Sequence, residues 1–171
     1  MKIIEKLTNN LTKEEINQII KLKNSHWNFG LKSQIEWFKK KINIKKKDIH
    51  IFIKNKKNIL GYVQLGYRKF NIKKNSQKYL LFRTLIINKK FRKKFFFKKI
   101  MNKVMDIINN KRIISFLTCK KDLVKFYNKY NWKRLKKNEF EIMDHQNNLI
   151  GMINNPFQRK IKKKILFYYD K

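Results

Sequence analysis

The stretch formed by residues 79–101 constrains the fold of this chain more than any other. It begins with a run rich in Leu, Ile, Phe and Thr between polar residues, which is the pattern of a buried strand. It ends with apolar residues at helical spacing, among them Phe97 and Ile100, while lysines fall on another face. A short basic turn, residues 89–94, separates the two. A strand that turns directly into a helix offers free backbone N–H groups and the positive end of the helix dipole, so the turn is a predicted phosphate or pyrophosphate site.

Two segments on either side of this turn resemble the GNAT superfamily of acyl-CoA-dependent N-acyltransferases. Residues 85–94 (LIINKKFRKK) are similar to the strand and pyrophosphate loop of that family, and residues 126–133 (FYNKYNWK) are similar to the end of its last conserved motif. The resemblance covers roughly residues 48–135. It departs from the family at two positions of the loop, where small residues are usual and this chain has Phe95 and Phe97.

The hydrophobic pattern of the rest of the chain predicts a strand, two helices and then further strands. This is also the order of elements at the start of the GNAT family that the two segments resemble. Residues 2–7 suit a first strand, and two capping boxes, Thr12 with Glu15 and Ser33 with Glu36, predict the starts of the two helices. Further elements are predicted as strands at residues 48–54, 59–69, 113–118, 132–144 and 149–153, and as a short helix at residues 122–130.

The expected fold class is therefore α/β (α+β), a single GNAT-type domain with a mixed, mostly antiparallel central sheet flanked by helices. We expect this domain to span residues 1–156. Residues 157–171 form a basic-aromatic C-terminal tail without a counterpart in the family.

The resemblance implies that acetyl-CoA is the co-substrate and that an acetyl group passes to a primary amine. It implies that Tyr127 is the general acid for the leaving thiolate, because a phenol with a pKa near ~10 has a proton to give at neutral pH; the alternative is a core tyrosine. The acceptor side would be lined by His26, Trp27, Phe29 and Glu36, unless the first three only pack the joint between the two helices. The cofactor-binding residues implied by the resemblance are Leu85, Ile86, Ile87, Arg92, Lys93, Lys94, Phe95, Phe96 and Phe97.

Two questions about this chemistry stay open in the sequence. The general base has four candidates, Glu36, His26, His50 and His145, and water-mediated action is a further alternative. If Phe95 or Phe97 covers the start of the helix, the chain would instead be a catalytically inactive GNAT-like basic protein that binds nucleic acid or another polyanion. The His and Cys residues have no metal-ligand spacing, so no metal is expected.

The composition bears on partners and location. The formal net charge is +34, but alanine is absent and residues with AT-rich codons are abundant, so an AT-rich genome accounts for much of this basic surface. Nucleic-acid binding is accordingly expected to be non-specific. The acceptor could be an amino-sugar, a small amine or a protein amine, and the sequence does not choose between them. The oligomeric state is likewise open between a monomer and a homodimer. A single cysteine fits a reducing compartment, and no apolar run suits a signal peptide or a membrane span, so we expect a cytoplasmic protein.

Overall fold

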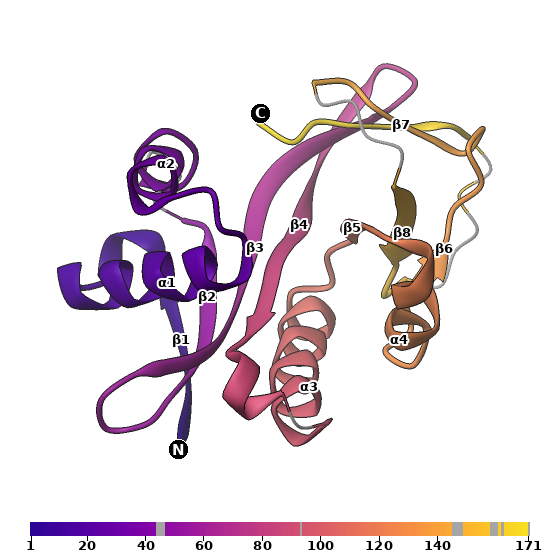
Figure 1. The fold of residues 1–171 in the computed structure, drawn as a ribbon. Helices are drawn as coiled ribbons and strands as arrows, with labels where there is room; N and C mark the ends of the chain where they lie inside the picture. Colours follow the sequence, from indigo (N-terminus) through magenta and orange to yellow (C-terminus); the bar gives the residue numbers. More distant parts are fainter. Residues whose placement is uncertain (44–46, 93, 145–148, 158–160, 162, 171) are drawn as a thin grey trace. The chain divides into compact units, whose positions relative to one another are not determined.

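The computed structural model describes residues 1–43, 47–92, 94–144, 149–157, 161 and 163–170 (Figure 1). The chain divides into two compact units, residues 1–66 with 83–104 (unit 1) and residues 67–82 with 105–171 (unit 2). Three long elements, β3, β4 and α3, contribute one part to each unit. The elements are β1 (Lys2–Leu7), α1 (Lys13–His26), α2 (Leu31–Trp37), a π-helical turn (Phe38–Asn43), β2 (Ile49–Lys54), β3 (Ile59–Ile72), β4 (Asn75–Ile87), α3 (Lys94–Lys111), β5 (Ser115–Cys119), α4 (Val124–Asn128), β6 (Lys133–Arg134), β7 (Phe140–Ile142), β8 (Ile150–Asn154) and β9 (Ile165–Phe167).

Unit 1 is a sheet with a helix packed on each face. Strands β1, β2 and β3 pair antiparallel in this order, and α1 and α2 lie beside them (Figure 1). Ile19 and Leu22 of α1 are buried in one cluster with Tyr62 of β3. At the preceding residue, Gly61, a Cβ atom would lie 3.0 Å from the side chain of Ile100 on α3. Because successive strand residues point to opposite faces, α1 and α3 cover opposite faces of this sheet.

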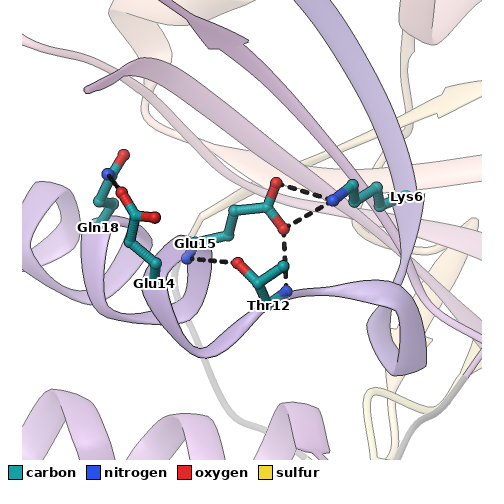
Figure 2. A network of polar contacts seen from close by, with 5 residues as sticks. All are labelled: Lys6, Thr12, Glu14, Glu15 and Gln18. Atoms are coloured by element: carbon teal, nitrogen blue, oxygen red, sulfur yellow. Dashed lines mark hydrogen bonds and ion pairs between the residues drawn. The ribbon is translucent and has the colours of Figure 1, made fainter. Parts of the chain in front are cut away.

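The start of α1 is fixed by the predicted capping box. The Thr12 hydroxyl accepts a hydrogen bond from the Glu15 backbone N–H at 3.1 Å, and the Glu15 carboxylate accepts one from the Thr12 N–H at 2.9 Å (Figure 2). The Lys6 ammonium on β1 donates to both carboxylate oxygens of Glu15, at 2.8 and 2.9 Å. One carboxylate therefore satisfies the helix end and ties α1 to the edge strand of the sheet.

We expect Thr12→Ala to lower the free energy of unfolding by about 1 kcal/mol, because the Glu15 N–H loses its acceptor. Urea denaturation measures this change. Thr12→Ser is the matched control, since it keeps the hydroxyl, and it should retain most of the stability. An equal loss in both variants would show that the hydroxyl is not the cause.

The second predicted capping box, Ser33 with Glu36, is wrong. Helix α2 begins at Leu31 and its N-cap is Gly30, so Ser33 already lies inside the helix. Gly30 has φ +84°, a conformation that a residue without a Cβ adopts without strain. The chain therefore turns into the helix earlier than the serine signal predicts.

Unit 2 contains a second part of the sheet and an aromatic core. Strand β5 pairs parallel with β4, where Leu80 lies opposite Ser115, and antiparallel with β8, which also pairs with β6. Strand β9 pairs antiparallel with β3 and parallel with β7. The ring centroids of Phe116 and Phe167 lie 3.8 Å apart in this core, and the Tyr79 ring packs edge-on against both. The mixed, mostly antiparallel sheet with flanking helices confirms the predicted fold class.

The C-terminal tail contributes β9 to this core, a strand that the sequence pattern did not predict. Two further contacts hold the residues that follow it. The Tyr79 hydroxyl donates to the Tyr168 carbonyl at 2.9 Å, and the Arg68 Nε donates to the Tyr169 carbonyl at 2.7 Å. Across the described ranges, no helix has the length and apolar character that would suit a membrane crossing.

Candidate functional site

The predicted strand, basic turn and helix are present in unit 1. Strand β4 ends at Ile87, a short 3-10 turn follows at Lys89–Phe91, and α3 then runs for 18 residues from Lys94 (Figure 1). Asn88 fixes the turn, because its N–H donates to the Leu60 carbonyl at 2.8 Å and its Oδ1 accepts from the Lys90 N–H at 3.1 Å. The first N–H groups of a helix have no partner within it, so the start of α3 is a suitable place for an anion.

Arg92 joins this turn to the end of α1. Its Nε donates to the Ile87 carbonyl at 3.3 Å, and its Nη2 donates to the His26 Nδ1 at 2.9 Å. Burial lowers the pKa of His26, and the nearby charges of Arg92 and Lys89 lower it further, which favours the neutral imidazole that this hydrogen bond needs. Two residues that the sequence assigned separately, one to the acceptor and one to the cofactor, are thus in direct contact. Lys93 and the side chain of Lys94 lie outside the described residues.

The three consecutive phenylalanines have different environments. Phe96 is buried at 7% exposure, Phe97 is half-buried, and Phe95 is 65% exposed, with its ring against Phe96. The most buried residue of the first turn is therefore Phe96, one turn before Ile100, while Phe97 is half-buried one turn before Met101. Three adjacent aromatic residues do not indicate which side of the helix faces the core. The apolar residues further along α3 determine that side.

Strand β4 carries a backbone irregularity just before the turn. Thr84 has φ +64° in the interior of the strand, a left-handed conformation that is strained for a β-branched residue. Beyond it, Leu85 is half-buried, while Ile86 and Ile87 are buried. Ile86 packs with the α1 cluster, and a Cβ at Gly61 would lie 2.5 Å from the Ile87 side chain. The Ile86 and Ile87 side chains are part of the core, so these two residues have only their backbone groups available to a ligand.

The loop between α1 and α2 brings part of the predicted acceptor side together. The His26 ring lies edge-on against Trp27 with centroids 4.5 Å apart, and Trp27 is half-buried against the α1 cluster. The Gln34 side chain donates to the Trp27 carbonyl at 3.2 Å and so links the loop to α2. Phe29 is 71% exposed and Glu36 is also exposed, so these two side chains lie largely in solvent.

Tyr127 lies on α4 in unit 2, with its ring packed edge-on against Phe82 and Trp132. Tyr127 is the residue of α4 that turns inward, since it is 6% exposed while Phe126 is half-buried. Within the described part of the chain, no group forms a hydrogen bond with the Tyr127 hydroxyl. Burial raises the pKa of this phenol, and Cys119 raises it further, so the hydroxyl holds its proton at neutral pH.

One residue of the site region was missed by the sequence analysis. Lys23 occupies the inner face of α1, at helical spacing from Ile19 and Ile20, and it is 5% exposed. Its ammonium lies 3.0 Å from the centroid of the Trp37 ring on α2. The signal in the sequence was the helical spacing of this lysine from two core-facing isoleucines. Lysine is rarely buried, so a lysine on the inner face of a helix marks an unusual site.

The comparisons with known proteins concern the fold. No family model and no curated protein matches the sequence. Among solved structures, an acyl-CoA N-acyltransferase from Pseudomonas aeruginosa is similar with a TM-score of 0.68 at 12% identity, over 90% of this chain and 99% of the other.

Two similar structures were solved with coenzyme A. The GNAT-family N-acetyltransferase YhbS from Escherichia coli, in complex with CoA, has a TM-score of 0.68 at 8% identity, over 99% of this chain and 90% of the other. An aminoglycoside 6'-N-acetyltransferase complexed with coenzyme A has a TM-score of 0.61 at 14% identity, over 92% of this chain and 99% of the other. The chain thus has the GNAT fold that its sequence resembles.

Proposed function

We propose that this chain is an N-acetyltransferase that moves an acetyl group from acetyl-CoA to a primary amine. The observation that carries the proposal is the basic turn between β4 and α3, where Arg92 and the start of an 18-residue helix provide a site for a pyrophosphate. The fold supports it, because two proteins of similar fold were solved with CoA.

The proposed roles follow from the chemistry of acyl transfer. The backbone N–H groups at the start of α3 and the Arg92 guanidinium hold the pyrophosphate. Thr84 has a left-handed backbone in the interior of β4, and the proposed place of the pantetheine arm and the acyl carbonyl is beside the peptide groups of this part of the strand. The acceptor nitrogen attacks that carbonyl, the C–N bond forms, and the C–S bond breaks. Tyr127 gives its proton to the departing thiolate.

The proposed acceptor is a primary amine of an amino-sugar, a small molecule or a protein. Its binding surface would include His26 and Trp27, which lie beside Arg92 in unit 1. The exposed ring of Phe29 and the exposed carboxylate of Glu36 are further groups that an acceptor reaches from solvent.

Calorimetric titration with CoA and acetyl-CoA tests the cofactor site. Arg92→Ala should weaken CoA binding about 10- to 150-fold, because a hydrogen bond to a charged group contributes about 1.5–3 kcal/mol. Arg134→Ala, which removes the same charge from an exposed position on β6, is the matched control and should bind CoA as the wild type does. Equal affinities of Arg92→Ala and the wild type would contradict the pyrophosphate site, and a wild-type chain that binds neither ligand would overturn the proposed function.

A further inference from the structure

Lys23 is a buried amine with an unusual set of neighbours, all in unit 1. Its ammonium faces the Trp37 ring at 3.0 Å from the centroid, and the Arg83 guanidinium carbon of β4 lies 5.2 Å from the centroid of the same ring. Within the described residues, no carboxylate forms an ion pair with Lys23 and no group forms a hydrogen bond with its side-chain nitrogen. A buried ammonium without an anion is costly, so this arrangement favours the neutral amine.

The electrostatics of this environment suit proton exchange. Burial lowers the pKa of Lys23 to about 7, and the charge of Arg83 contributes in the same direction. The face of Trp37 attracts the protonated form through a cation–π interaction, so the site accommodates both forms. Near neutral pH, a substantial fraction of Lys23 therefore carries a free lone pair.

The other candidates for a base are less suitable. Both ring nitrogens of His50 are engaged, with the Thr8 hydroxyl at 2.9 Å and the Tyr62 hydroxyl at 2.8 Å, and burial lowers its pKa to about 4. His26 is engaged by Arg92, and Glu36 is exposed to solvent on α2. His145 lies outside the described residues.

The place of Lys23 fits the proposed reaction. Arg83, which contacts the same Trp37 ring as Lys23, directly precedes Thr84, the left-handed residue of β4 to which the proposed function assigns the acyl carbonyl. An alkylamine acceptor with a pKa near ~10 is almost entirely protonated at neutral pH and cannot attack until it loses a proton. A neutral amine near this part of β4 is the group that can receive that proton.

We propose that Lys23 is the general base that deprotonates the acceptor ammonium, an inference that rests on the proposed acetyltransferase function. The acceptor R–NH₃⁺ gives a proton to the Lys23 nitrogen, and the free R–NH₂ forms the new C–N bond. After the C–N bond forms, the nitrogen loses one further proton to water as the C–S bond breaks. The thiolate takes the Tyr127 proton, and the Tyr127 phenolate regains a proton from water. Lys23 returns to the neutral amine by releasing its proton to solvent.

Two variants separate a base from a structural lysine. Lys23→Arg keeps a cation over the Trp37 ring but stays protonated at neutral pH, and Lys23→Met keeps the unbranched side chain without charge. Both should lower transfer from acetyl-CoA to ethanolamine about 10²–10⁴-fold. Both should remain within about tenfold of the wild type with hydroxylamine, which is largely unprotonated at neutral pH and needs no base. In the wild type, kcat/KM for ethanolamine should fall below pH 7, and this acidic limb should be absent from Lys23→Met.

An NMR titration tests the same residue without an acceptor. The resonance of isotopically labelled lysine side chains that is absent from Lys23→Arg belongs to Lys23, and its midpoint should lie near pH 7. A midpoint in the ordinary lysine range overturns the proposal, and so does undiminished ethanolamine transfer by Lys23→Arg. CoA binding by calorimetry, unchanged in both variants, separates this result from a failure of the proposed function, in which the wild type itself would not bind CoA.

Discussion

Tyr127→Phe should lower kcat about 10²–10⁴-fold, the usual loss for a general acid, while the affinity for CoA stays unchanged. The substitution removes only the hydroxyl and keeps the ring contacts with Phe82 and Trp132. Steady-state turnover with acetyl-CoA measures the loss, and calorimetry with CoA measures the affinity.

The same variant separates a catalytic from a structural role through its stability. A buried hydroxyl with a protein partner would destabilise the fold on removal, but the Tyr127 hydroxyl has no such partner within the described residues. Thermal unfolding of Tyr127→Phe should therefore match the wild type or occur at a slightly higher temperature. Tyr130→Phe, on a half-buried tyrosine three residues further on, is the control and should keep full turnover. Full turnover of Tyr127→Phe would remove this residue from the mechanism.

The sequence predicted the features that depend on short-range pattern. The capping box at Thr12 sets the start of α1, and alternation of apolar residues placed strands β2 and β3 within a few residues of their observed bounds. The strand, basic turn and helix around Arg92 were also predicted, because a continuous apolar run is followed, after the basic turn, by apolar residues at helical spacing.

The misses depend on tertiary contacts that local pattern does not report. Tyr127 turns inward because Phe82 and Trp132 form an aromatic pocket around it, and α4 has only five residues, too few to define a face. Lys23 is buried because Trp37, from the next helix, covers its ammonium. The contact between Arg92 and His26 joins residues 66 positions apart, a distance that no motif spans.

Strand β9 is another element that the local sequence pattern did not predict. Its three residues lie among lysines in a tail that reads as a basic surface segment. Yet Phe167 is fully buried, stacks on Phe116 at 3.8 Å between ring centroids and meets the Tyr79 ring at 4.9 Å. The core of unit 2 was completed by a residue from the end of the chain, which pairs with β3 almost a hundred positions earlier.

Phe167→Ala should therefore lower the free energy of unfolding by about 3–5 kcal/mol, the usual loss for a phenylalanine truncated inside a core. Urea denaturation measures this loss as a lower midpoint with an unchanged slope. Phe157→Ala is the matched control, because Phe157 belongs to the same tail but is 45% exposed, and its effect should stay within about 1 kcal/mol. A tail peripheral to the fold would give small and equal effects at both positions. A large loss at Phe167 alone would mean that a chain cut after residue 156 lacks part of its core, since the stacked partner Phe116 would then face a cavity or solvent.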